Sequence, residues 1–220
     1  RNVPLVSFND PKLMLGVPPA LTAATGMDTF VQAIEPYVST NRNDITDGQC
    51  LQAIKLVEES LREAVSNGEN LEARTKMVEA EMLGGMAFNN ADLGYVHAMA
   101  HQLGGQYDAP HGVCCAILLP IVERFNLVAC PDRFADLAVA MGENIDGLSI
   151  RAAADKAIDA MQQLNDDVGI PRSIKDLGAD PKDFELMAEN ALKDGNAFSN
   201  PRKATKQQIV ELFQQAYDAK

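Results

Sequence analysis

Residues 89–112 read NNADLGYVHAMAHQLGGQYDAPHG, and this stretch holds all three histidines of the chain. His97 and His101 lie four residues apart, so on a helix they share one face. His111 follows a Gly-Gly pair and a proline, where the chain can turn back toward that face. Imidazoles gathered in this way are typical ligands of a divalent transition metal. The stretch therefore predicts a helix that carries a metal or catalytic site.

The segments on both sides of this stretch also have helical patterns. An Ala/Met/Glu-rich helix is expected over 70–88, and the histidine helix over 91–103, ended by Gly104-Gly105. A nearly all-apolar helix is expected over 111–126, where Pro120 should kink or restart the helix. The last of these helices is the candidate for the buried centre of the protein.

The first part of the chain predicts a helix that contributes polar residues. Pro18-Pro19 favours a helix start, Gly26 should interrupt the helix, and residues 27–38 resume it. Asp28, Gln32 and Glu35 then lie at i, i+4 and i+7 on one polar stripe.

Capping signals place further helices. Thr46–Gln49 and Thr205–Gln208 are capping-box patterns, Ser149 is a candidate N-cap, and Asp180-Pro181 favours a helix start. Apart from a β-like run over 3–8, no segment alternates like a strand. The prediction is a single all-α domain over residues 1–220, with roughly eight or nine helices.

The composition limits the class of protein. The 220 residues include 19 lysines and arginines and 31 aspartates and glutamates, which gives a formal net charge of −12. A nucleic-acid backbone needs a basic surface, so we expect no nucleic-acid partner. Hydrophobic residues make up 46% and aromatic residues only 5%, which favours an aliphatic core between packed helices.

The sequence also indicates a compartment. The longest apolar run, Val113–Val122, contains a proline and is only 10 residues long, whereas a membrane span needs about 20. The first residues lack the layout of a signal peptide. The four cysteines show no CxxC spacing, which favours buried free thiols in a reducing compartment. We therefore expect a cytoplasmic protein without a membrane partner.

Two ligand sets remain open for the histidine cluster. Three imidazoles alone suit zinc, whereas imidazoles completed by a carboxylate from another helix suit Fe(II) or Zn(II). Asp28 is the candidate carboxylate, and its alternative role is to stabilise the dipole at a helix start. Cys114 and Cys115 are alternative nucleophiles, but apolar surroundings raise a thiol pKa and favour inert side chains.

Four stretches carry a resemblance to a known family. They are residues 20–28 (ALTAATGMD), 33–39 (AIEPYVS), 85–105 (GMAFNNADLGYVHAMAHQLGG) and 110–113 (PHGV). They resemble the C-terminal half of the iron-containing (group III) alcohol dehydrogenases, which include lactaldehyde reductase and 1,3-propanediol dehydrogenase. The resemblance covers essentially the whole chain and is strongest to the branch that acts on small alcohols.

The resemblance implies a domain assignment. In this family an N-terminal α/β domain binds NAD(P) through a glycine-rich loop, and an all-helical, dehydroquinate synthase-like C-terminal domain holds the metal. The chain contains no GxGxxG motif, so residues 1–220 are interpreted as the helical metal-binding domain. Residues 1–10 are interpreted as a remnant of the preceding NAD-binding domain, and no residue of the chain is assigned to NAD(P).

The resemblance also implies the roles of particular residues. By position, the family's metal ligands fall on Asp28, Gln32, His97 and His111, and His101 matches the catalytic histidine beside the nicotinamide and substrate. The family has histidine at the position of Gln32. An amide oxygen is a weaker ligand than an imidazole, so Gln32 is expected to bind weakly or through water. The implied ion is Fe2+, with Zn2+ as the alternative.

The implied activity is an NAD(P)-dependent interconversion of short-chain primary alcohols and aldehydes. The metal polarises the alcohol oxygen, and the alkoxide passes hydride to the nicotinamide. Family members are homo-oligomers, usually dimers or larger. Without the missing nucleotide-binding domain, we expect the isolated chain to be inactive. The alternative is a non-catalytic helical metal-binding or assembly module with an impaired site, which Gln32 favours; a metal hydrolase has no supporting motif.

Overall fold

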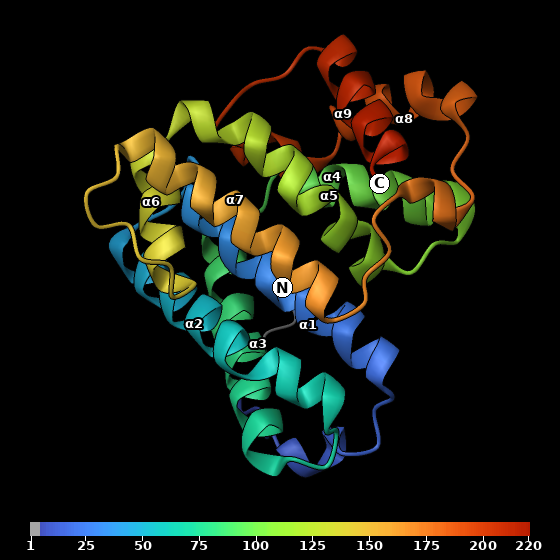
Figure 1. Cartoon of the computed structure of the whole chain (residues 1–220). Coiled ribbons are helices and arrows are strands. Elements are labelled where there is room, and N and C mark those ends of the chain that lie inside the picture. Colours follow the sequence, from blue (N-terminus) through green and yellow to red (C-terminus); the bar gives the residue numbers. More distant parts are fainter. Residues whose placement is uncertain (1–4) are drawn as a thin grey trace.

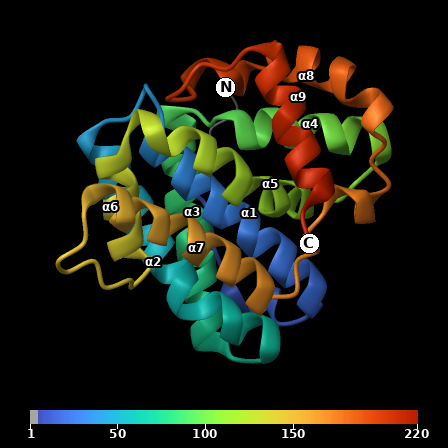
Figure 2. The same cartoon turned by 45° about the horizontal axis from the view of Figure 1, so that its top comes forward.

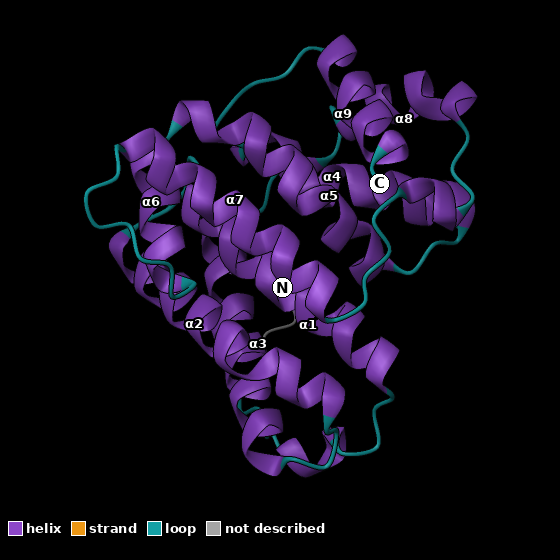
Figure 3. Ribbon diagram, in the orientation of Figure 1, coloured by secondary structure: helices purple, strands orange, loops and turns teal. Residues whose placement is uncertain are grey.

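A computed structural model describes residues 5–220, and these residues form nine α-helices and no strand (Figure 3). The predicted all-α fold is confirmed. The β-like run predicted over 3–8 is wrong for residues 5–8, which have no regular structure. Residues 3 and 4 lie outside the described part of the chain. The helices are α1 (Pro19–Val38), α2 (Asp44–Ser66), α3 (Leu71–Ala91), α4 (Tyr95–Tyr107), α5 (His111–Asn126), α6 (Pro131–Ala140), α7 (Ile150–Asp167), α8 (Phe184–Ala191) and α9 (Lys206–Asp218).

Helix α1 runs through the middle of the bundle (Figure 1) and packs against α2, α3 and α5. Helix α5 also contacts α4 and α7, and α4 contacts α8, which packs against α9. Turning the molecule shows α4, α8 and α9 gathered on one side, with α2, α3, α6 and α7 on the other (Figure 2). This arrangement brings α1, α4 and α5 together, although the connecting chain between α1 and α4 is long.

Local sequence signals account for where several helices begin. Pro19 occupies the first turn of α1, where a missing backbone N–H has no cost. Ser149 accepts a hydrogen bond from the backbone N–H of Ala152, and Thr205 and Gln208 form the predicted capping box of α9. These three predictions are confirmed.

The start of α2 is a correction to the predicted capping box at Thr46. The helix begins at Asp44, and Asn43 is the N-cap. The Asn43 side chain accepts from the backbone N–H of Thr46, and the Thr46 hydroxyl accepts from the backbone N–H of Asn43. Thr46 is thus the inner member of the box. Asn is as good an N-cap as Thr, so the sequence is compatible with a capping box that begins at Asn43 or at Thr46.

The interruption predicted at Gly26 does not occur, and the ends predicted for two other helices fall a few residues too early. Helix α1 passes through Gly26, α3 passes through Asn89-Asn90 to Ala91, and α4 passes through Gly104-Gly105 to Tyr107. Glycine in a helix costs about 1 kcal/mol, which tertiary packing offsets. At Gly26 a Cβ atom would lie only 2.3 Å from Leu61 Cδ1, so this glycine permits close packing of α1 on α2.

Helix α5 and its following turn, His111–Ala129, form the one segment among the described residues that is long and apolar enough to span a membrane. Most of this segment is buried inside the protein, against α1, α4 and α7. Burial against three helices is what the core helix of a folded domain requires. Pro120 lies inside the helix without ending it.

Candidate metal centre

The polar stripe predicted on α1 faces the histidine cluster. Asp28 Oδ2 accepts a hydrogen bond of 3.0 Å from Gln32 Nε2. The other carboxylate oxygen, Asp28 Oδ1, is buried and has no hydrogen-bond partner among the described residues, and the same holds for Gln32 Oε1. A buried oxygen without a partner is costly, so these two atoms need a ligand that the protein itself does not supply.

His97 is the buried member of the cluster, with 3% of its side chain exposed. Its Nδ1 atom lies 2.6 Å from Glu35 Oε2, and its Nε2 atom lies 3.4 Å from Asp28 Oδ1. Burial lowers the pKa of His97, but the adjacent carboxylates of Asp28 and Glu35 outweigh it and raise the pKa to about 9. The imidazole therefore lies in a pocket that stabilises positive charge.

Glu35 fixes the orientation of this imidazole. Its second oxygen, Oε1, accepts a 2.7 Å hydrogen bond from the backbone N–H of Val96, in the first turn of α4. Because both carboxylate oxygens act as acceptors, the proton of a neutral His97 lies on Nδ1. In this neutral form the lone pair of Nε2 is directed at Asp28 Oδ1, and either a proton on Nε2 or a metal cation between the two atoms relieves the repulsion of the two acceptors.

His111 is the first residue of α5, after Pro110. Its Nε2 atom lies 3.5 Å from Asp28 Oδ1, and its side chain is 43% exposed. The pKa of His111 is lowered, mainly by burial and further by the nearby imidazoles. The negative charge of Asp28 acts in the other direction but does not outweigh them. The neutral ring that results is the form that binds metals.

Two glycines permit these approaches. Gly94 precedes α4, and a Cβ atom there would lie 2.7 Å from Glu35 Oε1 and 2.8 Å from Asn200 Oδ1. Gly112 follows His111, and a Cβ atom there would lie 2.2 Å from the carbonyl oxygen of Ala24. Both positions therefore require glycine because of steric exclusion, and neither has a positive φ.

His101 lies at the rim of the cluster. Its ring stacks on that of His111, with centroids 5.5 Å apart. Its Nδ1 atom lies 2.7 Å from Asp194 Oδ2, and 41% of its side chain is exposed. No contact joins His101 to Asp28 among the described residues. It is thus placed beside the predicted ligands rather than among them.

The cluster has the spacing that a metal ion needs. One ligand atom each from Asp28, His97, His111 and Cys115 lies within 4.8 Å of the others. Metal–nitrogen and metal–oxygen bonds of about 2.1 Å in a tetrahedral site place neighbouring ligand atoms about 3.4 Å apart. The distances from Asp28 Oδ1 to the two imidazoles have this value. Together with the unpartnered carboxylate oxygen, they show that these residues fit a divalent ion.

Sequence reasoning did not assign three further residues to this cluster. Glu35 belongs to the predicted polar stripe, and Cys115 lies one helical turn after His111, so their positions were available from spacing. Asp194 is 93 residues from His101, and nothing local indicates that the two meet.

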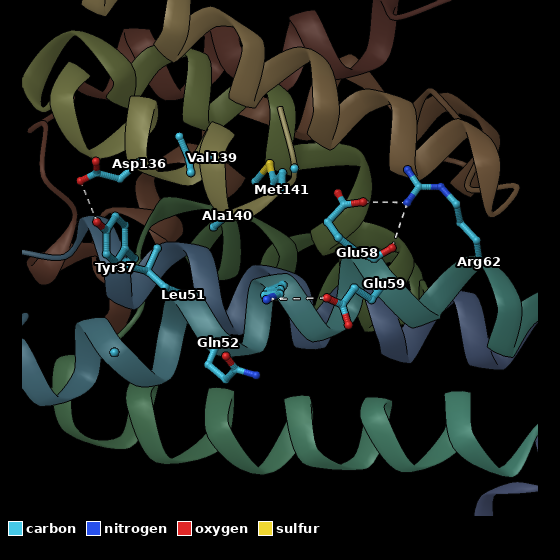
Figure 4. Close-up of a pocket in the computed structure, with 13 residues that line it drawn as sticks. Tyr37, Leu51, Gln52, Glu58, Glu59, Arg62, Asp136, Val139, Ala140 and Met141 are labelled. Carbon is cyan, nitrogen blue, oxygen red and sulfur yellow. Dashed lines mark hydrogen bonds and ion pairs between the residues drawn. The ribbon is translucent and has the colours of Figure 1, made fainter. Parts of the chain in front are cut away.

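In the part of the chain that the structure describes, one hollow includes a residue of the cluster and another lies apart from it. A cleft of about 1090 Å3 between α1, α3 and the segment before α1 includes Asp28 in its lining. A second hollow, of about 1100 Å3, lies between α2 and α6 and contains none of the histidines. Four of its polar side chains are paired with one another, Tyr37 with Asp136 and Glu58 with Arg62 (Figure 4).

Comparison with known proteins gives a consistent result. Residues 22–217 match the family model described as Fe-containing alcohol dehydrogenase family, C-terminal. The chain is 59% identical over 217 residues to 1,3-propanediol dehydrogenase of Klebsiella pneumoniae, covering 99% of this chain and 56% of that protein. It is 46% identical over 213 residues to an NAD-dependent methanol dehydrogenase of Bacillus methanolicus, covering 97% and 56%.

A solved structure agrees with this match. The alcohol dehydrogenase from Oenococcus oeni superposes with a TM-score of 0.97 at 75% identity, covering 98% of this chain and 56% of that one. The chain thus spans about half the length of the relatives it matches.

Proposed function

The chain belongs to the Fe-containing alcohol dehydrogenase family, and from this membership we propose that it is the metal-binding part of an NAD(P)-dependent alcohol dehydrogenase. The proposed reaction interconverts short-chain primary alcohols and aldehydes. The names of the two relatives, a propanediol and a methanol dehydrogenase, support small alcohols as the substrate class. Because the chain spans 56% of each, the nucleotide-binding part is assigned to the remainder of such a protein.

The observation that carries the proposal is the convergence on Asp28 Oδ1. This buried oxygen lacks a hydrogen-bond partner and faces two imidazole nitrogens at 3.4 and 3.5 Å. Asp28, His97 and His111 would hold a divalent ion, Fe2+ or Zn2+, with Gln32 as a weak or water-mediated ligand. When bound, such an ion supplies Lewis-acid polarisation of the alcohol oxygen.

Glu35 and His101 support the site in different ways. Glu35 holds the proton of His97 on Nδ1 and so keeps Nε2 free to act as a donor ligand. His101 lies at the exposed rim, where its ring can exchange a proton with the substrate hydroxyl or with solvent. The carboxylate of Asp194, 2.7 Å from His101 Nδ1, holds the orientation of that ring. The cleft beside Asp28 gives a small molecule a route to the cluster.

The test is an assay of a protein that joins this chain to its nucleotide-binding part. Alcohol-dependent reduction of NAD+ and NADP+ is measured with ethanol, 1-propanol and 1,3-propanediol after loading with Fe2+ or Zn2+. We expect metal-dependent turnover that Asp28→Asn abolishes and that Asp136→Asn, at the distant hollow, leaves unchanged. The isolated chain should be inactive. Metal binding without turnover on any short alcohol would reject the dehydrogenase and favour the non-catalytic metal-binding module.

A further inference from the structure

Cys115 occupies a position at the cluster that the family's ligand set does not use. It lies on α5, one turn after His111, and its side chain is fully buried. Its Sγ atom is 3.5 Å from His111 Nε2. The same sulfur lies within 4.8 Å of the ligand atoms of Asp28 and His97. Four potential ligand atoms from three helices therefore surround one point.

The neighbouring Cys114 shows that this placement is not a general property of the cysteines. It is equally buried and adjacent in sequence, but it does not belong to the cluster. Successive residues on a helix point about 100° apart, so only one of the pair faces α1 and α4 at this level. Cys114 can therefore serve as the control residue in experiments on Cys115.

The rest of the cluster leaves room for a further strong ligand. Gln32 stands where the resembled family has histidine, and it donates its amide N–H to Asp28. An amide held in this way offers at most a weak ligand oxygen. Cysteine sulfur, by contrast, is among the strongest protein ligands for divalent transition metals.

We propose that Cys115 is a ligand of the metal centre, bound as a thiolate beside Asp28, His97 and His111. The proposal rests on the metal centre of the proposed function. On binding, the S–H bond loses its proton to solvent and the sulfur lone pair forms the bond to the metal, with no change in oxidation state. A thiolate is a softer donor than an imidazole, so this set favours Zn2+ and Co2+ over Fe2+.

A fourth protein ligand would also affect where an alcohol can bind. If Asp28, His97, His111 and Cys115 all bound the ion, they would complete a set of four protein ligands, whereas catalytic zinc sites commonly keep one position open for substrate or water. The side chain of His111 is 43% exposed, and Asp28 lines the cleft between α1 and α3.

Cobalt substitution tests the proposal without relying on activity. The purified protein is stripped with a chelator and loaded with Co2+, and its metal content and near-ultraviolet absorption are measured. A cobalt–thiolate bond gives an intense charge-transfer band that oxygen and nitrogen ligands do not give. We expect this band in the unaltered protein and in Cys114→Ser, and we expect Cys115→Ser to bind Co2+ more weakly and to lack it.

X-ray absorption of the zinc-loaded, unaltered protein provides a readout that does not depend on any variant folding. We expect one sulfur neighbour at about 2.3 Å from the zinc. Bound cobalt or zinc without a sulfur neighbour, or a charge-transfer band that survives in Cys115→Ser, overturns the thiolate assignment while leaving the metal centre in place. Failure of the unaltered protein to bind either ion would overturn both proposals.

Discussion

At the scale of single residues, Glu35 is the side chain on which the proposed site most depends. Replacing it by Gln keeps its size but supplies one acceptor in place of two. If the amide oxygen still accepts from Val96, the amide N–H2 faces His97 Nδ1 and drives the imidazole proton to Nε2. That tautomer cannot bind a metal, so we expect Glu35→Gln to weaken Zn2+ binding by about 10–100-fold.

Isothermal titration of the chelator-stripped protein measures this effect. Glu123→Gln is the matched control, because Glu123 is also a fully buried carboxylate but bonds to Asn126 instead of a histidine. Equal zinc affinities for Glu35→Gln and Glu123→Gln would contradict the role given to Glu35.

Glu123 itself makes stability depend on pH. Burial, followed by the nearby charge of Glu35, raises its pKa from an ordinary 4.5 to about 8, although Asn126 donates to it. Between these values the folded state keeps a proton that the unfolded state releases, so stability falls as pH rises through this window. Gln carries no charge, so Glu123→Gln should flatten this dependence and be the more stable form at pH 8.

Urea unfolding of both proteins at pH 5, 6.5 and 8 measures the difference. The contribution of Glu123 is fully present below about pH 4.5 and lost near pH 8. Parallel stability curves for the two proteins would show that Glu123 is already charged in the folded state.

Much of the cluster was accessible from the sequence, for reasons that differ between residues. The i, i+4 spacing and the following proline placed His97, His101 and His111 together. Asp28 was reached mainly through the family resemblance, because spacing alone cannot show which helix packs opposite another. The pairing of His101 with Asp194 is a contact between distant segments, and only the folded chain reveals it.

At the scale of helices, the α1–α5 contact sets the position of His111. A methyl group at Gly112 would lie 2.2 Å from the backbone oxygen of Ala24, which cannot rotate away. We expect Gly112→Ala to destabilise the protein by about 1–3 kcal/mol and to weaken metal binding by moving His111 away from Asp28.

Gly105→Ala is the control for this change. Gly105 also lies in a helix near the cluster, but nothing stands within 4 Å of its missing Cβ atom. Alanine there should be neutral or stabilising by about 0.5–1 kcal/mol. Thermal unfolding and zinc titration of the two variants separate steric exclusion from helix propensity, and similar losses in both would contradict our account.

Helix existence was easier to predict than helix extent. Amphipathic and apolar periodicity located the helices that build the site, and capping residues located several of their starts. Glycine and asparagine signals, however, placed ends too early in α3 and α4. The local preference at Gly104-Gly105 is about 1 kcal/mol per residue, and burial of neighbouring Leu103 in the core offsets it.

At the scale of the whole molecule, metal binding should stabilise a fold that already exists. The proposed ligands lie on three helices whose contacts continue far into an aliphatic core. Chelator should therefore leave the protein folded. Zinc at 100 times its Kd should add about 2.7 kcal/mol, which raises the Tm of a domain of this size by roughly 5–10 °C.

Differential scanning calorimetry with and without zinc measures this shift, and Asp28→Asn should remove it. A chelated protein that has lost its helical circular dichroism would instead show that the ion is needed for folding. A zinc-induced shift that persists in Asp28→Asn would place the ion elsewhere.

The close approaches at Gly94 and Gly112 have a consequence for how mutational data on this protein should be read. In a saturation scan selected for the proposed alcohol turnover, both positions would score as intolerant of every replacement, as catalytic residues do. Neither has a side chain to contribute chemistry. Ranking positions by intolerance alone would thus count Gly94 and Gly112 among the catalytic residues. A parallel scan for folded protein would distinguish these two glycines from residues that take part in the chemistry.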